Sequence, residues 1–445
     1  MTSVVILQTP PRFPRVLLPA NLPDNPTDID AAQASGWFAA LRRAITELRA
    51  DGVLAALSTS GVRGRGFPGL PLGVKWTACA RARADRKYVV VNAYQSDPAV
   101  MTDRLLLECN PYAVFEGAAI AALTVGAKEI VFAVRTEATE AIKTLESAIS
   151  VARRAGYLGD DVLGSGLQLE ASVRALEGSY MLGEETVLLK GLEGKRGQPE
   201  QQPPYTTTRG LWGMPTLVHG PQTFAAVPTI INGGNEEFAE TSPRAYAGTI
   251  LVHLYGSVVQ PGIAEVPLGA TLREILDVAG GMPAGRRLKA VLVGGPTGGL
   301  ISPDDLGVAF DNGSLEKVGA YVGSGSIVVV DQQACVVDLA ATLTRFAADQ
   351  ACGKTIPCRI GLRRLAEIGQ RFCDGQPRGD DVALVEDLAS DIVESALCDH
   401  ERRATLALTS LVRSFRDELD AHIVRNTCPA GVCHPKVGAR ASAAS

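Results

Sequence analysis

The stretch Lys87-Tyr88-Val89-Val90-Val91 decides the fold class of this chain. It is short and rich in β-branched residues, which is typical of a buried β-strand. A second such run, Glu129-Ile130-Val131-Phe132-Ala133-Val134, follows after alanine-rich sequence with helical spacing. Strands that alternate with helices are typical of α/β proteins. The sequence therefore predicts an α/β fold with a largely parallel sheet.

The pattern changes on both sides of this region. Residues 249–256 read as a strand. A turn at Pro261-Gly262, a second strand, a helix near 271–276 and a strand over 290–295 follow, and this order indicates a small β-grasp-like module. From about residue 335 the apolar spacing is helical. We predict a lead-in over 1–50, an α/β domain over 51–245, a β-grasp module over 246–333, a cysteine-bearing helical bundle over 334–436 and a mobile tail over 437–445.

Composition narrows the class of protein. The 445 residues are 46% hydrophobic and 20% charged, which is typical of a globular protein. The net charge of -5 does not indicate a protein that binds nucleic acid. No apolar run is long enough for a membrane-spanning helix, and the first residues do not resemble a secretory signal, so we expect a cytoplasmic protein. Nine scattered cysteines favour free thiols or metal ligands over disulfides.

Residues 60–76 read Ser-Gly-Val-Arg-Gly-Arg-Gly-Phe-Pro-Gly-Leu-Pro-Leu-Gly-Val-Lys-Trp. Glycines let backbone N–H groups approach a phosphate closely, and arginine or lysine neutralises its charge. The segment is therefore a candidate phosphate-binding loop. The alternative is a glycine-rich surface loop.

A metal site is indicated by Cys352-Gly353-Lys354-Thr355-Ile356-Pro357-Cys358, with Cys398 downstream. The spacing is that of a four-thiolate iron–sulfur site, but Thr355 stands where one cysteine is expected. A neutral hydroxyl is a poor substitute for a soft thiolate.

Further stretches extend these two motifs in a fixed order. They are Asn-Ala-Tyr-Gln-Ser-Asp-Pro over 92–98, Gly-Ser-Tyr-Met-Leu-Gly-Glu-Glu-Thr over 178–186 and Gly-Leu-Trp-Gly-Met-Pro-Thr over 210–216. Together, across nearly the whole chain, they resemble the NADH-binding flavoprotein subunit of respiratory complex I. The same subunit type occurs in soluble NAD-dependent hydrogenases and formate dehydrogenases.

The resemblance implies a Rossmann-like FMN-binding domain, an SLBB-type β-grasp module and a helical bundle with a [4Fe-4S] cluster. It implies hydride transfer from NADH to FMN and single-electron transfer to partners, namely a [2Fe-2S] thioredoxin-like subunit and further redox subunits. Such a complex would place the chain in the cytoplasm or at the inner membrane face.

Site residues follow from the same resemblance. It implies catalytic roles for Glu184, Glu185 and Asp97. A tight turn with a solvated acidic pair is the alternative for the first two. The implied cofactor-binding residues are Gly64, Gly66, Lys75, Asn92, Tyr180, Gly183, Glu184, Tyr205 and His219, and the implied metal ligands are Cys352, Cys358 and Cys398, with Thr355 at the remaining ligand position.

The chain also departs from the family pattern. Phe67 would crowd a backbone that must approach phosphate, and Leu70 and Ala78 replace aromatic residues that would sandwich the nucleotide. Tyr94-Gln95-Ser96-Asp97 keeps one carboxylate of three. We therefore expect a weaker nucleotide site.

His219 and Gly220 stand where the family has two asparagines at the flavin edge. His219 either donates a hydrogen bond to the flavin or is a packed loop histidine, and we prefer the second.

Two interpretations of the cysteines stay open. Cys352, Cys358 and Cys398 would hold a three-iron or a labile four-iron cluster, or they are free thiols in a packed bundle. Cys373 would reach the site only after a backbone rearrangement, and His400 is a weaker substitute ligand.

Near the end of the chain, His422 with Cys428-Pro-Ala-Gly-Val-Cys433-His434 offers ligands of the kind zinc takes. Alternatively, and preferably, this segment is a remnant of a junction that leads to a ferredoxin-like extension in soluble members of the family.

Three functions fit these observations. The first is a flavin-dependent NAD(P)H oxidoreductase subunit that exchanges electrons with a partner redox protein. The second is a catalytically degenerate homologue that acts as a scaffold or assembly subunit. The third is an FMN protein with a changed electron donor or acceptor.

Overall fold

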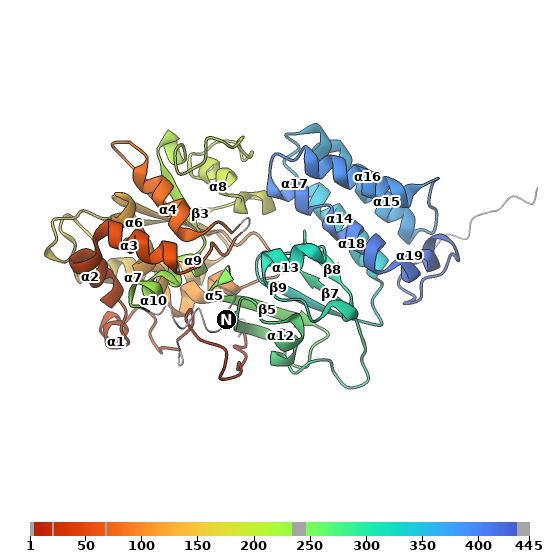
Figure 1. The fold of residues 1–445 in the computed structure, drawn as a ribbon, viewed down its shortest axis with the longest axis horizontal. Coiled ribbons are helices and arrows are strands. Elements are labelled where there is room, and N and C mark those ends of the chain that lie inside the picture. Colours follow the sequence, from red (N-terminus) through yellow and green to blue (C-terminus); the bar gives the residue numbers. More distant parts are fainter. Residues whose placement is uncertain (1–3, 20–21, 67–68, 234–245, 434–445) are drawn as a thin grey trace, which may run out of the picture. The chain divides into compact units, whose positions relative to one another are not determined.

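The computed structural model describes residues 4–19, 22–66, 69–233 and 246–433. Figure 1 shows the fold. The chain divides into two compact units. The first comprises residues 1–253, 262–270 and 309–311, and the second comprises residues 254–261, 271–308 and 312–445. The predicted tail over 437–445, the candidate zinc ligand His434 and Phe67 lie outside the described residues.

A four-stranded parallel sheet forms the centre of the first unit. Its strand order is β3-β2-β1-β4, and β1 pairs in parallel with both β2 and β4. Val91 is opposite Phe132 on one side and His219 on the other. The predicted α/β fold with a parallel sheet is therefore confirmed. The strands are β1 (Tyr88–Ala93), β2 (Glu129–Arg135), β3 (Glu170–Leu176) and β4 (Thr216–His219).

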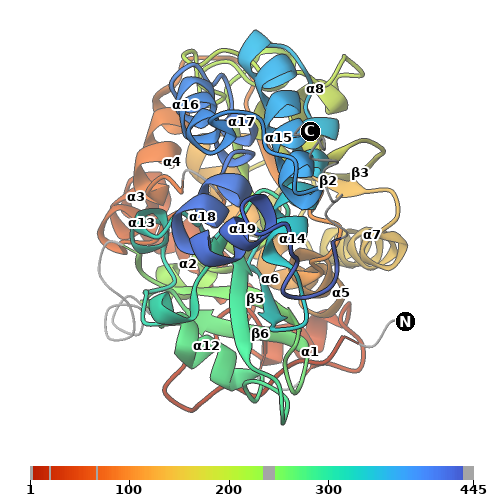
Figure 2. The same ribbon diagram turned by 90° about the vertical axis from the view of Figure 1, so that its right-hand side faces the viewer.

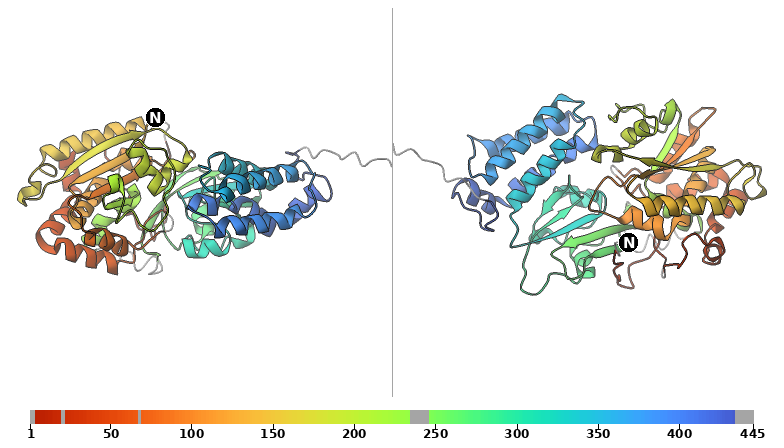
Figure 3. Two further views of the ribbon diagram at one scale, coloured as in Figure 1. Left: turned by 90° about the horizontal axis from the view of Figure 1, so that it is seen from above. Right: turned by 180° about the vertical axis from the view of Figure 1, so that it is seen from behind.

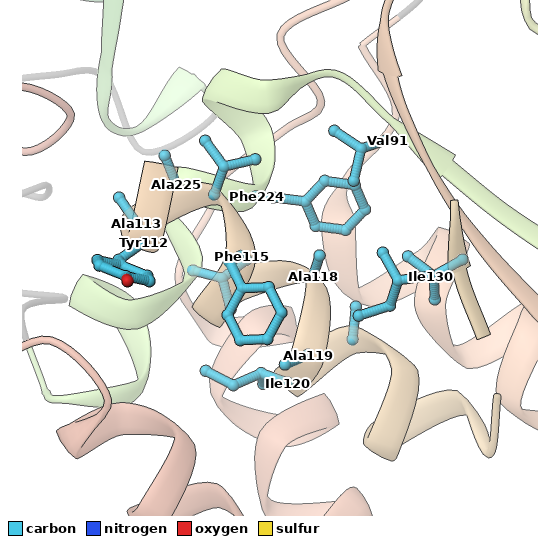
Figure 4. Close-up of a cluster of buried hydrophobic side chains, with 14 of the residues drawn as sticks. Val91, Tyr112, Ala113, Phe115, Ala118, Ala119, Ile120, Ile130, Phe224 and Ala225 are labelled. Atoms are coloured by element: carbon cyan, nitrogen blue, oxygen red, sulfur yellow. The ribbon is translucent and has the colours of Figure 1, made fainter. Parts of the chain in front are cut away.

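The helix α6 (Pro111–Val125) packs into the core of this unit because nearly all of its residues are apolar and buried. Figure 4 shows Phe115 and Ala118 of this helix beside Val91 of β1 and Ile130 of β2. A Cβ atom at Gly117 would lie 1.9 Å from the carbonyl oxygen of Phe224, so only glycine allows α9 to cross α6 this closely.

Other helices and short turns of the first unit surround the sheet. Figure 3 shows α7, in gold, running alongside the strands, and α7 contacts β3. The helical elements are α1 (Ile29–Ala34), α2 (Ala39–Arg43), η1 (Ala44–Leu48), α3 (Arg49–Thr59), α4 (Leu72–Arg81), α5 (Thr102–Cys109), α7 (Thr139–Arg154), η2 (Val162–Gly164), η3 (Tyr180–Gly183), α8 (Glu185–Leu192), η4 (Leu211–Gly213), α9 (Pro221–Ala225) and α10 (Val227–Ile231).

A second sheet has the order β6-β5-β9-β7-β8, and the division between the two units falls within β5. In this sheet β7 is antiparallel to β8 and β9. The strand–strand–helix–strand order agrees with the predicted second sheet, while the residue limits of the five predicted segments stay predictions. The elements are β5 (Thr249–Gly256), β6 (Gly262–Pro267), α12 (Leu272–Val278), β7 (Leu288–Val293), β8 (Gly299–Ile301), η6 (Pro303–Asp305), α13 (Asn312–Lys317) and β9 (Ser326–Asp331).

The predicted helices at the C-terminal end are confirmed. Their apolar residues at helical spacing, among them Leu365, Phe372 and Leu408, meet in one buried cluster. Figure 2 shows α14, α18 and α19 side by side. None of the helices in the described ranges is long and apolar enough to cross a membrane. The elements are α14 (Val336–Asp349), η7 (Pro357–Gly361), α15 (Leu362–Cys373), α16 (Asp381–Glu394), α17 (Asp399–Arg403), α18 (Leu406–Ser414) and α19 (Arg416–Ile423).

Candidate functional site

The carboxyl ends of β1 and β4 define the candidate site in the first unit. Ligands of open α/β sheets bind outside this edge, where neighbouring parallel strands end together. Asn92 lies near the end of β1, and His219 is the last residue of β4. The Asn92 side chain donates a hydrogen bond from Nδ2 to the carbonyl oxygen of Gly183, at 2.9 Å. The predicted segment 178–186 is thereby held at this edge of the sheet.

His219 is buried beside the glycine-rich loop. Its Nε2 accepts a hydrogen bond from the Trp76 indole at 3.2 Å, and its ring packs edge-on against Phe224. Burial, and secondarily the charge of Lys75, hold the His219 pKa well below its usual range. The ring is therefore neutral and carries its proton on Nδ1. These contacts favour the packed histidine, whose Nδ1 would lie 3.5 Å from a Cβ atom built at Gly64.

Lys75 is part of an ion pair. Its Nζ lies 2.6 Å from Glu185 Oε2 and donates to the carbonyl oxygen of Val218 at 2.8 Å. The other Glu185 oxygen accepts a hydrogen bond from the Thr206 hydroxyl. The two charged side chains remain 12% and 27% exposed, so they are only partly withdrawn from solvent. The lysine predicted to contact phosphate is thus already paired with a predicted catalytic carboxylate.

Glu184 has a different position from its neighbour. Its Oε2 accepts hydrogen bonds from the backbone N–H groups of Thr186 and Val187, both at 2.9 Å, so it caps the N-terminus of α8. Burial raises its pKa despite these hydrogen bonds. A Cβ atom at Gly183 would lie 2.5 Å from the Ser96 hydroxyl, so glycine is needed there. The contacts of Glu184 are those of a structural residue.

The 92–98 stretch shows how one departure from the family pattern is accommodated. Tyr94 is fully buried, and its hydroxyl donates to the Gly178 carbonyl oxygen at 2.5 Å. Asp97 is 3% exposed and accepts a hydrogen bond from the Ala99 backbone at 3.1 Å. Tyr94 therefore replaces a carboxylate by a packed ring, and Asp97 holds a turn.

Several predicted residues remain open to solvent. Tyr205 is 55% exposed, which leaves an aromatic face for stacking. Leu70 is also exposed, at 42%. Within the described ranges, no residue other than the two chain neighbours lies within 4 Å of a Cβ atom built at Gly66. Tyr180 begins the short helix η3 and is half-buried.

The arginines of the glycine-rich loop donate hydrogen bonds to backbone carbonyl groups. Arg65 donates from Nε to the carbonyl oxygen of Thr249 at 2.8 Å and from a terminal nitrogen to that of Ala247 at 3.2 Å. Burial lowers its pKa to about 10. Arg63 donates to the carbonyl oxygen of Gly69 at 2.6 Å. These two arginines are therefore held by backbone carbonyls, which the local sequence does not reveal.

The residues at this edge fit a flavin nucleotide. Missing side chains at Gly64 and Gly66 allow a close approach to the backbone, and Gly64 lies next to the neutral His219 ring. Asn92 and Gly183 join β1 to the 178–186 segment, and Tyr205 offers an exposed ring.

The predicted cluster site lies in the second unit, and it contains a carboxylate. The Thr355 hydroxyl donates to Glu401 Oε1 at 2.7 Å, and Glu401 Oε2 accepts from the backbone of Leu397, the residue before Cys398, at 2.8 Å. Glu401 is fully buried. Burial, and next the Glu401 charge, raise the pKa of Cys358 to about 12.

This carboxylate therefore lies between the two segments that carry the cysteines. The residues present do not fit a four-thiolate cluster, because one ligand is a hydroxyl and an added negative charge occupies the site. His400 is buried, and its Nε2 lies 2.8 Å from the Ala347 carbonyl oxygen.

Another group of potential ligands lies elsewhere in the second unit. Cys335, His422, Cys428 and Cys433 bring their ligand atoms within 4.8 Å of one another. The sequence indicated three of them but not Cys335, which precedes α14 and has no other cysteine or histidine within ten residues in sequence. Cys373 groups with Cys433 and Asp338.

Known proteins match both parts of the chain. Residues 57–229 match the Nuo51 FMN-binding domain, and residues 338–422 match the NADH-ubiquinone oxidoreductase-F iron-sulfur binding region. The NADP-reducing hydrogenase subunit HndC of Solidesulfovibrio fructosivorans is 38% identical over 92% of this chain and 83% of its own length. The F 2 subunit of the NADH-quinone oxidoreductase of Rhizobium meliloti is 35% identical over 94% of this chain and 99% of its own length.

Solved structures agree. A chain of the NAD+-reducing [NiFe]-hydrogenase in the H2-reduced state matches with a TM-score of 0.81 and 26% identity, covering 95% of this chain and 68% of that one. The fold and the site thus define an FMN-binding electron-transfer flavoprotein with an iron–sulfur binding region. The chain belongs to the family of the NADH-quinone oxidoreductase F subunits and the related flavoprotein subunits of hydrogenases. The resemblance stated from the sequence is confirmed.

Membership of this family also tests the predicted function, cofactors and partners. Its members transfer electrons between NAD(H) and partner redox proteins through FMN, as the sequence predicted. NADH as a substrate fits the family. The relatives are subunits of larger complexes with other redox subunits. The roles of the individual site residues stay predictions.

Proposed function

We propose that this chain is an NAD(P)H-oxidising flavoprotein subunit that delivers electrons to a partner redox protein. The observation that carries the proposal is the edge of the parallel sheet, where Gly64, His219, Asn92 and Gly183 lie together. FMN, when bound, accepts two electrons as hydride and passes them on singly. The protein supplies binding and orientation.

Individual residues then have separate tasks. The backbone at Gly64 and Gly66 approaches the phosphate and ribityl region of the flavin, and the exposed ring of Tyr205 stacks with the nucleotide. The Lys75–Glu185 pair presents a balanced, partly exposed charge pair to the nicotinamide side. Glu184 and Asp97 hold the loops that carry these groups.

The route by which electrons leave the chain differs from the standard family path. A four-thiolate cluster does not fit beside Thr355 and Glu401, so we propose direct delivery from the flavin domain to the partner. A [2Fe-2S] thioredoxin-like subunit is the proposed partner. All nine cysteines lie in the described ranges and are free thiols, which supports a reducing compartment such as the cytoplasm.

The experiment is anaerobic titration of the purified chain. We expect a flavin absorption band at about one flavin per chain and its bleaching by NADH or NADPH. Gly64→Val should lower the flavin content at least tenfold, because the valine side chain would occupy the space beside His219 where we propose that the flavin binds. Gly307→Val is the matched control, since no atom of the described residues apart from the two chain neighbours lies within 4 Å of a Cβ atom there.

The scaffold function is the second candidate, favoured by the buried Glu401 and by the inward-pointing Arg65. A folded chain that takes up no flavin would support it and would contradict the oxidoreductase. A chain that holds flavin but is bleached only by another reductant would leave an FMN protein with a changed donor.

A further inference from the structure

Four potential metal ligands converge from three segments of the second unit. Cys335 precedes α14, His422 lies on α19, and Cys428 and Cys433 flank a turn after α19. Cys335 Sγ lies 3.4 Å from His422 Nε2 and 3.6 Å from Cys433 Sγ. The sequence separation between Cys335 and His422 is 87 residues, so folding alone brings them together.

The distances between the ligand atoms match those around a single ion with tetrahedral coordination. With Zn–S bonds of about 2.3 Å and Zn–N bonds of about 2.0 Å, tetrahedral angles place two sulfurs about 3.8 Å apart and a sulfur and a nitrogen about 3.5 Å apart. The observed 3.6 Å and 3.4 Å lie close to these values. A four-iron cluster binds its thiolates on different irons, which requires wider spacing. The group is therefore suited to one ion.

His422 is oriented as a ligand. Its Nδ1 lies 2.8 Å from the carbonyl oxygen of Glu418 and donates to it, which places the proton on Nδ1. The lone pair of Nε2 then faces Cys335. Metal-bound histidines typically have this second hydrogen bond, which sets the tautomer.

Backbone N–H groups support the sulfurs. Asp338 donates to Cys335 Sγ and Cys433 donates to Cys428 Sγ, each at 3.4 Å. The turn that presents Cys428 and Cys433 contains Gly431 at φ 68°, a left-handed conformation that favours glycine. The 3.6 Å between Cys335 and Cys433 is far longer than a disulfide bond of about 2.05 Å. The thiols are separate and available for an ion.

We propose that Cys335, His422, Cys428 and Cys433 bind one Zn²⁺ ion. Cys335 is 3% exposed and His422 is fully buried, so four protein ligands enclose the ion and leave no open position for a substrate. The ion is structural: it fastens α19 and the 428–433 turn to the N-terminus of α14 (Figure 2). A backbone hydrogen bond from Val336 to Glu418 Oε1, at 3.1 Å, joins the same two helices. The proposal is independent of the flavin site.

Cys373 provides a sharp control. It groups with Asp338 and Cys433, yet it is outside the four-ligand group. Because Cys433 belongs to both groups, only one of them can hold an ion with that thiolate as a terminal ligand. The complete set of three thiolates and one imidazole suits zinc better than a set with two thiolates and one carboxylate.

The test is the metal content of the full-length chain, purified from cells supplied with zinc and iron. We expect about one zinc per chain, lowered at least tenfold in Cys428→Ser and unchanged in Cys373→Ser. Cobalt replacement provides a second measurement on the unaltered chain, because a tetrahedral site with three thiolates has strong sulfur-to-cobalt charge-transfer absorption and visible bands. This measurement does not depend on the folding of a variant.

Three outcomes of the metal measurements would overturn the proposal. They are a folded chain with less than one tenth of an equivalent of zinc and no tetrahedral cobalt spectrum, full zinc retention in Cys428→Ser, and loss of zinc in Cys373→Ser but not in Cys428→Ser. A disulfide between Cys335 and Cys433 in the chain purified under reducing conditions would also contradict it.

Discussion

At the scale of single residues, Glu401 explains why Thr355 is tolerated in an iron–sulfur binding region. A buried carboxylate needs hydrogen-bond donors, and the Thr355 hydroxyl at 2.7 Å and the Leu397 backbone at 2.8 Å supply them. Thr355 and Glu401 therefore act as a pair. A change of either residue alone leaves the other in an unfavourable position.

This pairing leads to the first prediction. Thr355→Cys alone adds a thiolate but removes a donor from Glu401 and leaves its charge in the site. We expect it to bind little iron after anaerobic reconstitution, whereas Thr355→Cys combined with Glu401→Gly should reach about four iron atoms per chain. Iron analysis and the cluster absorption band check this result. Full iron incorporation in Thr355→Cys alone would contradict the role of Glu401.

The second prediction assigns different roles to the neighbouring residues Glu184 and Glu185. Glu184→Ala removes the cap of α8, so it should cost about 1 kcal/mol of unfolding free energy. Flavin reduction by the nicotinamide nucleotide should change less than threefold. Glu185→Ala leaves Lys75 unpaired at the site and should slow that reduction at least tenfold with little change in stability. Stopped-flow reduction and chemical denaturation measure the two effects, and equal effects of both variants on reduction would reject these roles.

At the scale of elements, the helices α2 and α6 are joined by a buried carboxylate. Glu116 of α6 is fully buried, and its Oε1 accepts a hydrogen bond from the backbone of Leu41, in α2, at 2.9 Å. The backbone of Phe38, which precedes α2, has φ 71°. Burial raises the Glu116 pKa from its usual 4.5 to about 7, although backbone hydrogen bonds near the start of α2 oppose the shift. The Glu116 side chain thus binds the start of α2, although burial makes its charged form unfavourable in free energy.

The third prediction follows from the sign of this shift. The folded state binds the proton more tightly than the unfolded chain, so stability should fall as the pH rises from about 4.5 to 7 and become constant above. The shift corresponds to at most about 3 kcal/mol. Asp103, whose pKa burial raises to about 6, adds to the same trend.

Chemical denaturation at pH 5 and pH 8 measures this trend. Glu116→Gln should flatten the pH dependence, while the exposed Glu146→Gln should leave it unchanged. An equal slope in wild type and Glu116→Gln would contradict the assignment.

The sequence predicted the helices and strands of this protein better than the contacts between them. The β-branched runs at Lys87 and Glu129 became β1 and β2, because alternation and apolar content are visible within a few residues. Local sequence does not reveal that the Arg65 guanidinium binds the backbone at Ala247 and Thr249. Those carbonyl groups are distant in sequence and become neighbours only after folding.

At the scale of the whole molecule, the two candidate sites lie in different compact units. The flavin-site residues fall within residues 1–253, and the proposed zinc ligands fall within residues 312–445. The fourth prediction is that zinc removal by a chelator leaves the flavin affinity unchanged within twofold while the unfolding midpoint of the chain decreases. Fluorescence titration of FMN before and after chelation checks it. A parallel loss of zinc and flavin would show that the sites are coupled.

The family and the general chemistry of this protein are determined by its sequence. Short motifs identify the family: the glycine-rich loop, the 92–98 and 178–186 stretches and the cysteine spacing. Each can be recognised without the structure, because its residues lie close together in the sequence. Only the tertiary structure decided what the departures mean. Thr355 meets Glu401 across 46 residues, and Cys335 meets His422 across 87, because helix packing joins segments with no local signal for each other.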